Sequence, residues 1–203
     1  MKLKIYLGIF FICFLFLGVF LDVTQQPKKA DIIFCFGGKG TSRILESLKL
    51  LNDGFSKKNK LYYSAKKEYL LYKIKDKKNK IEFIKHSNIV FIENLKNTME
   101  EVKYLDDLVN QQKLASVLIV SDPPHSRRIK LLIQEFSNNL ERKYIIVSSN
   151  TVWWNKYFYF TNWDAFQFAI LELIKIIYNN IKYGLFNFFH KDIYRADKIV
   201  EKT

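Results

Sequence analysis

Short apolar runs alternate with amphipathic stretches from residue 31 onward. Runs at 32–36, 61–64, 117–120 and 144–147 have the length and β-branched content of buried strands, and at least one strand is expected in 81–84 or 89–92. Between the runs, apolar positions recur at helical spacing and predict helices over 41–51, 66–74, 98–110 and 125–136. Strict alternation of this kind predicts an α/β fold built on a parallel sheet.

The first residues form a different kind of segment. Residues 5–21 are an uncharged apolar run of about 17 residues after Lys2 and Lys4, and no small-residue cleavage site follows them. This pattern predicts an uncleaved signal anchor, with a cleaved signal peptide as the alternative. Because lysines before a span stay inside, the domain is expected on the periplasmic or extracytoplasmic side of a bacterial inner membrane, held by a single pass.

These segments together predict the fold class and the division of the chain. The fold class is α/β, a three-layer Rossmann-like parallel sheet with helices on both faces, preceded by one N-terminal transmembrane helix. The expected parts are the anchor at 1–24, a linker at 25–30, the α/β domain at 31–185 and a tail at 186–203.

The last part of the domain is unusually apolar. Residues 152–160 are dense in aromatic side chains, and 165–183 are apolar nearly all round a helix. Such a helix is usually buried, so a final helix packed on the sheet is expected. The aromatic segment is consistent both with a buried loop and with a flap or membrane-surface patch. Glu172 and Lys175 argue against a second membrane span.

Composition narrows the class of partner. The chain has 203 residues, and 49% of them are hydrophobic, which indicates a folded domain. Its formal net charge of +13 is consistent with attraction to anionic partners and with a lysine-rich solvated surface. No arginine-rich arm or RNA-binding aromatic pattern occurs, so no nucleic acid is expected. Cys13 and Cys35 lie in segments that cannot pair, no Cys/His spacing predicts a metal site, and no cofactor is identified.

Unusual polar residues follow each predicted strand. In chain order they are Gly37, Gly38 and Arg43; Ser64; Glu93, Asn97, Thr98 and Glu100; Ser121, Asp122, His125 and Arg128; and the polar residues 148–151. The carboxyl ends of parallel strands share one edge of the sheet, so these residues predict a pocket there.

Several of these residues have an equally good structural interpretation. The glycines suit a tight turn, while Asn97, Thr98 and Asp122 suit helix caps. His125 and Arg128 differ, because cations in the first turn of a helix oppose its dipole and favour an anion nearby. We therefore expect Arg43, His125 and Arg128 to contact an anionic group. His125 is the candidate general acid or base, partnered by Glu93 or Glu100.

Three short patterns resemble the YdcF-like family of bacterial domains, which includes SanA-like and ElyC-like envelope proteins. They are Gly37, Gly38 and Arg43 after the first strand; Asn97, Thr98 and Glu100 before a helix; and Ser121, Asp122, His125 and Arg128 after an apolar strand. Glu172 and Lys175 resemble the family's E-x-x-K. The resemblance covers about residues 31–178 and implies a Rossmann-like fold and a role in the cell envelope. Arg127 lies outside the pattern and is expected to face solvent.

The leading hypothesis is a membrane-anchored envelope protein whose pocket binds an anionic, phosphate-bearing ligand such as a lipid-linked cell-wall precursor. If it is an enzyme, it is a hydrolase or transferase acting on such a precursor. One alternative is a nucleotide- or S-adenosylmethionine-binding Rossmann-like protein, although G-x-G-x-x-G is missing. The other is a non-enzymatic envelope scaffold whose aromatic segment 152–160 carries the interaction.

Overall fold

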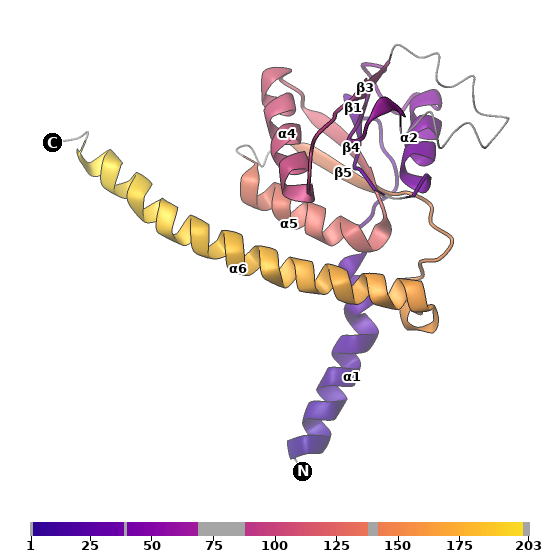
Figure 1. The fold of residues 1–203 in the computed structure, drawn as a ribbon, viewed down its shortest axis with the longest axis vertical. Helices are drawn as coiled ribbons and strands as arrows, with labels where there is room; N and C mark the ends of the chain where they lie inside the picture. The colour runs from indigo at the N-terminus through magenta and orange to yellow at the C-terminus, as the bar shows by residue number, and fades with distance from the viewer. Residues whose placement is uncertain (1, 39, 69–87, 138–141, 201–203) are drawn as a thin grey trace.

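A five-stranded parallel sheet forms the centre of the protein, shown in Figure 1 as a computed structural model that describes residues 2–38, 40–68, 88–137 and 142–200. The strands are β1 (Ile32–Cys35), β2 (Leu61–Tyr63), β3 (Ile89–Phe91), β4 (Ser116–Ser121) and β5 (Lys143–Ser148). Their order across the sheet is β3-β2-β1-β4-β5. The chain moves outward from β1 to β3 and returns beside β1 with β4, so its direction reverses between the carboxyl ends of β1 and β4.

Helices cover both faces of this sheet. They are α1 (Lys2–Leu21), α2 (Ser42–Asn52), α4 (Thr98–Gln111), α5 (Ser126–Phe136) and α6 (Trp163–Val200), with 3₁₀ turns η2 (Pro123–His125) and η3 (Tyr159–Thr161). Helix α2 lies on one face, and α4 and α5 lie on the other (Figure 1). The prediction of a parallel α/β sheet between helical layers is confirmed.

Alternate residues of each central strand enter different cores. Phe34 and Ile119 pack with α4 and α5, whereas Ile33 and Leu118 pack with α2. Because both faces are covered, all of β4 is buried, which explains why its sequence is a continuous apolar run. Cys35 is a buried free thiol in the α2 core.

Most predicted elements are present, with shifts of a residue or two at their ends. Of the two alternatives for the middle strand, 89–92 forms β3; the run at 81–84 and most of the helix expected at 66–74 lie outside the described residues. The helix expected to begin at His125 begins at Ser126, after the 3₁₀ turn η2. Pro123 and Pro124 open that turn, where their missing N–H groups cost nothing.

Helix α1 extends away from the domain, and only its last turns pack against it (Figure 1). Leu17 and Leu21 are buried with Tyr159 and the start of α6. Within the part of the chain described, no helix combines the length and the apolar character needed to cross a membrane.

The segment after α1 is fastened to the start of α5. Ser126 Oγ accepts a hydrogen bond from Val23 N at 2.8 Å, and Arg127 Nε donates to Phe20 O at 2.7 Å. Arg127 is half-exposed, so the expectation that it faces solvent holds in part, while its guanidinium bonds to the carbonyl end of α1, where a cation is favourable. Beyond this point Gln25 N donates to Ile146 O at 2.8 Å, so the linker lies against the outer edge of β5.

The final helix differs most from its prediction. Helix α6 runs from Trp163 to Val200, well past the end expected at residue 183, and it packs on α5, η2 and α1 instead of lying on the sheet. Ala165, Ala169 and Ile176 are buried, but Ile174 and Ile181 are more than half exposed. One side of this apolar helix therefore faces solvent.

Gly18 of α1 provides a test of how that helix is seated. A Cβ atom at Gly18 would overlap the carbonyl of Lys156 and lie 2.8 Å from the Tyr159 ring, whereas one at Gly8 would meet nothing within 4 Å. We expect Gly18→Ala to lower the free energy of unfolding of the full chain by about 1–3 kcal/mol, as overpacking does. Thermal unfolding followed by tryptophan fluorescence measures it. Gly8→Ala is the control, and equal stability of the two variants would contradict the packing described.

Candidate functional site

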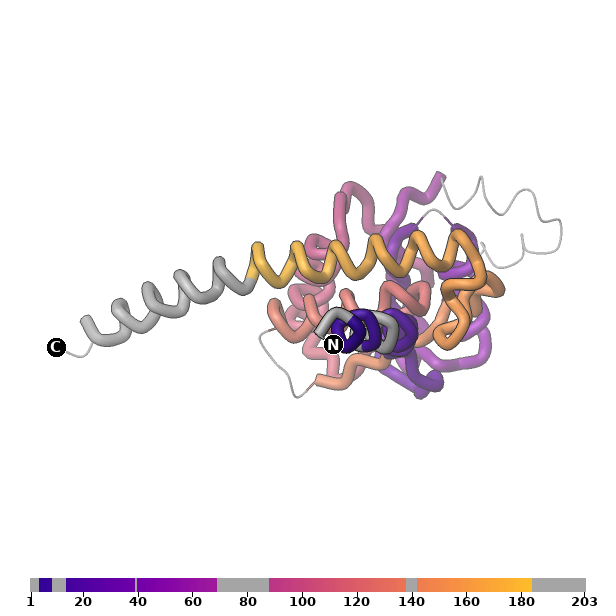
Figure 2. Tube along the Cα trace, turned by 90° about the horizontal axis from the view of Figure 1, so that it is seen from below, coloured from indigo at the N-terminus to yellow at the C-terminus, as the bar shows by residue number. Residues whose placement is uncertain are grey.

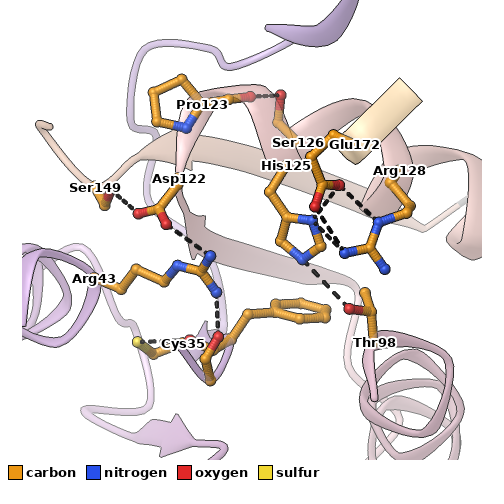
Figure 3. A network of polar contacts seen from close by, with 12 residues as sticks. Cys35, Arg43, Thr98, Asp122, Pro123, His125, Ser126, Arg128, Ser149 and Glu172 are labelled. Atoms are coloured by element: carbon orange, nitrogen blue, oxygen red, sulfur yellow. Dashed lines mark hydrogen bonds and ion pairs between the residues drawn. The ribbon is translucent and has the colours of Figure 1, made fainter. Parts of the chain in front are cut away.

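Arg43, in the first turn of α2, spans the crevice where the sheet reverses direction. Its Nη2 lies 2.7 Å from Asp122 Oδ2 after β4, and its other terminal nitrogen donates to Gly37 O after β1 (Figure 3). Ser149, after β5, donates to Asp122 Oδ1 at 2.6 Å. Burial alone would raise the pKa of Asp122, but the hydrogen bond and charge of Arg43 outweigh burial and hold that pKa below its usual value.

A second buried ion cluster lies beside the first, around Glu172 of α6. Glu172 is 1% exposed. Arg128 of α5 donates two hydrogen bonds to it, from Nε to Oε2 at 2.7 Å and from Nη2 to Oε1 at 3.1 Å. His125 Nδ1 lies 3.0 Å from Oε2, and Lys175 Nζ reaches Oε1 from solvent at 3.1 Å. His125 and Arg128, which were predicted to contact an anionic ligand, thus contact a carboxylate of the chain itself.

The partners of His125 indicate its protonation. Burial would raise the pKa of Glu172, but His125 and Arg128 outweigh it and keep the pKa well below its usual value, so Glu172 is an ionised acceptor. Nδ1 lies 3.0 Å from Glu172 Oε2, which can only accept, and 3.0 Å from Arg128 Nη2, which can only donate, so these two contacts favour opposite tautomers of the ring. Burial lowers the pKa of His125 to about 4, against the opposing effect of Glu172 and with support from Arg128 and Arg43. The ring is neutral near pH 7.

Nε2 of this neutral ring faces Thr98, the first residue of α4. The distance from Nε2 to Thr98 Oγ1 is 3.4 Å (Figure 3). The threonine hydroxyl donates when the ring proton is on Nδ1 and accepts when it is on Nε2. Carboxylate, imidazole and hydroxyl stand in the order Glu172, His125, Thr98, the order in which a base-activated hydroxyl is arranged in many enzymes.

A cavity of about 390 Å³ opens in front of Thr98. Its lining includes five predicted site residues: Gly37, Gly38, Ser64, Asn97 and Thr98. Glu101 also lines it and accepts a hydrogen bond from Gly37 N at 2.7 Å. A Cβ atom at Gly37 would lie 2.5 Å from Ser64 O and 3.2 Å from Glu101 Oε1, so this close approach requires glycine.

Glu101 is a buried carboxyl group inside this cavity wall. Burial raises its pKa, while hydrogen bonds from Ser64 and Gly37 N and the charges of Arg43 and Arg128 act against the shift. The protonated form is therefore favoured more than for an ordinary glutamate, which lowers the repulsion that an anionic ligand would meet.

The structure places the remaining predicted residues in structural roles. Asn97 caps α4 by accepting from Glu100 N at 3.1 Å, and Glu100 accepts from Lys96 N at 2.8 Å, so Glu100 completes a cap and does not orient His125. Glu93 is exposed, and no described contact joins it to His125. Ser121 is fully buried, and its hydroxyl has no hydrogen-bond partner among the described residues.

Two central carboxylates were not predicted as site residues. Glu101 shares an apolar stripe of α4 with Leu105 and Leu108, and Glu172 interrupts an otherwise apolar helix. In both cases the sequence places a carboxylate at a helix position expected to be buried. Because a buried carboxylate requires a partner, this placement was the signal that could have identified both residues.

The described residues contain no group of three His, Cys, Asp or Glu side chains placed to hold a metal ion. Comparisons of the chain with protein-family models, curated proteins and solved structures gave no match. Fold and site therefore define a class only: an α/β protein with a parallel sheet and a small polar cavity at its carboxyl edge. Its function is argued below from the geometry of that cavity.

The buried ion cluster predicts a large asymmetry between two neighbouring residues of α6. Glu172→Gln removes the only negative charge in contact with Arg128 in the described structure, so we expect a loss of about 3–5 kcal/mol in the free energy of unfolding. Lys175→Gln, whose side chain is half exposed, is the control and should cost under about 1 kcal/mol. Urea unfolding of the full chain measures both, and similar losses would show that Glu172 is not the buried centre described.

His125 predicts a loss of stability on mild acidification. Its folded pKa of about 4 lies below the unfolded value of 6.5, so the unfolded chain binds the proton more readily. Stability present near neutral pH therefore falls as the pH drops, by about 2 kcal/mol between pH 7 and pH 5 for this group alone. Glu101, whose pKa is raised, acts in the opposite sense.

The contribution of His125 is isolated by comparing wild type with His125→Gln in urea unfolding at pH 7 and pH 5. The wild-type loss should exceed the variant's loss by about 2 kcal/mol. Parallel losses in the two proteins would mean that the ring is not held neutral.

Proposed function

We propose that the carboxyl-edge cavity binds the phosphate group of a small lipid-linked molecule of the cell envelope. The observation that carries this proposal is the opening of the cavity at the first turn of α4, beside two hydroxyl groups and two glycines. The proposal keeps the sequence-based hypothesis of a membrane-anchored envelope protein and assigns it a specific cavity.

The groups around the cavity favour a negatively charged ligand. Helix α4 has 14 residues, and the N-terminus of such a helix attracts phosphate through its N–H groups and its dipole. Ser64 and Thr98 supply hydroxyl groups, and Lys96 supplies an exposed positive charge. Arg43 and Arg128 are already neutralised by internal carboxylates, so they support the wall of the cavity and do not contact the ligand in this proposal.

The cavity also supports proton-transfer chemistry. In the tautomer with the ring proton on Nδ1, that nitrogen donates to Glu172, and Nε2 is free to accept the Thr98 proton. In a transferase or hydrolase reaction, Thr98 Oγ1 would form the bond to phosphorus as its proton passes to Nε2. The leaving oxygen would then take that proton as its own bond to phosphorus breaks.

Binding of farnesyl phosphate to the full chain in detergent micelles tests the proposal. Isothermal titration calorimetry should show binding of farnesyl phosphate and none of farnesol, because the phosphate provides the recognition. A bound phosphate takes the Thr98 hydroxyl as its donor in place of Nε2, so Thr98→Val should weaken binding about tenfold or more, since a hydrogen bond to a charged group contributes about 1.5–3 kcal/mol.

Thr41→Val is the matched control. Thr41 precedes α2, makes no side-chain capping hydrogen bond and lies outside the cavity lining, so its replacement should leave the affinity unchanged. Equal binding of farnesol, or equal affinities for the two valine variants, would refute the proposal. Selective binding of adenosine cofactors in the same assay would favour the nucleotide- or S-adenosylmethionine-binding alternative.

A further inference from the structure

In the part of the chain that the structure describes, exposed large apolar side chains lie at residues 5–20 and 152–181. Between residues 21 and 151, the described residues expose no large apolar side chain. All of those exposed lie on α1, on the loop 152–162 or on α6. Among the described residues, the exposed large apolar side chains thus belong to α1, the loop and α6 and not to the sheet or the helices that cover it.

Helix α6 carries two apolar stripes on opposite sides. Ala165, Ala169 and Ile176 are buried against α1 and the loop 152–162. At about 3.6 residues a turn, Ile174 and Ile181 lie on the reverse side, where they are 56% and 58% exposed. This arrangement explains why the helix is apolar nearly all round without being fully buried. We call its exposed apolar side, which includes Trp163, Ile174 and Ile181, the outward stripe.

The aromatic loop continues this stripe at the start of α6. Tyr157, Phe158 and Trp163 are each more than half exposed, at 60%, 59% and 68%. Helix α6 lies across α1 at the point where α1 leaves the domain (Figure 1). The view from below along α1 shows α6 passing beside it, with the domain behind both helices (Figure 2).

We propose that the outward stripe of α6 and the aromatic loop rest on the surface of an anionic lipid bilayer. Trp and Tyr rings prefer the headgroup level, where Trp163, Tyr157 and Tyr178 would lie. Lys175 and Lys182 flank the stripe on one side and are exposed, whereas Asp164 is the one exposed acid among residues 152–183. Apolar side chains bordered by lysines are the pattern of a helix that lies flat in an anionic interface.

This surface is a different one from the cavity of the proposed function, and the proposal does not depend on whether α1 enters the bilayer. Helix α6 contacts η2, the turn after β4, through buried Glu172. The stripe is on the opposite side of the helix and faces away from that contact.

Quenching of added tryptophans by brominated lipids tests the proposal on the full chain. The chain is reconstituted into vesicles of phosphatidylcholine brominated at carbons six and seven of one acyl chain, mixed with phosphatidylglycerol. Three variants report on three sites: Ile174→Trp on the stripe, Leu7→Trp on α1 and Lys49→Trp on α2. All three positions are exposed, so native tryptophan emission in detergent should confirm that the fold is kept.

The proposal expects about a twofold loss of the added emission for Ile174→Trp, because a ring seated about 5–10 Å below the headgroups lies near the bromines. Lys49→Trp should keep its emission. Adding Lys175→Gln and Lys182→Gln should reduce the quenching at Ile174→Trp, and no change would refute the role given to anionic lipid.

Two results would overturn the proposal as a whole. Quenching for Leu7→Trp without quenching for Ile174→Trp would leave α1 as an anchor and remove α6 from the bilayer. An unquenched Ile174→Trp, together with a dimeric mass by light scattering that Ile174→Glu abolishes, would assign the stripe to contact with a second copy of the chain.

Discussion

The buried carboxylate of Glu172 is the interaction on which much of this arrangement depends. A charge at 1% exposure is tolerable only with close partners, and both Arg128 and His125 supply them. Meeting those partners brings α6 onto α5 and η2, and the same helix then provides Ala165 and Ala169 as the seat for the end of α1. The position of both long helices is thus tied to the contacts that one carboxylate makes with Arg128 and His125.

The eight residues from Ser121 to Arg128 distribute their polar side chains among five elements. Asp122 bonds to α2 and to the loop after β5, His125 bonds to α4 and α6, and Arg127 bonds to the end of α1. Each contact satisfies a buried or half-buried polar group. The segment therefore organises the carboxyl edge chiefly by internal bonding, and the cavity for a ligand lies to one side, at α4.

The strands, their parallel arrangement and the sharing of one edge could be predicted because local periodicity encodes them. Arg43, His125 and Arg128 were predicted to contact an anionic ligand, and in the structure each contacts a carboxylate of the chain itself. That the anions are Asp122 and Glu172 could not be read from spacing, because residues 44 to 79 positions apart meet only through the tertiary fold. The outward face of α6 was missed for a related reason: hydrophobicity all round a helix does not distinguish burial in a core from a second apolar environment.

The backbone hydrogen bond from Gln25 N to Ile146 O has a consequence for how the domain behaves when it is separated from α1 and the linker. A parallel sheet with an open outer strand is a template for pairing with other chains, and here the linker occupies part of that edge at β5. A fragment that begins at Asp31 would lack this cover as well as the Val23 contact to Ser126. Such a fragment would present β5 to its neighbours, and its state of association would reflect the cut and not the native protein.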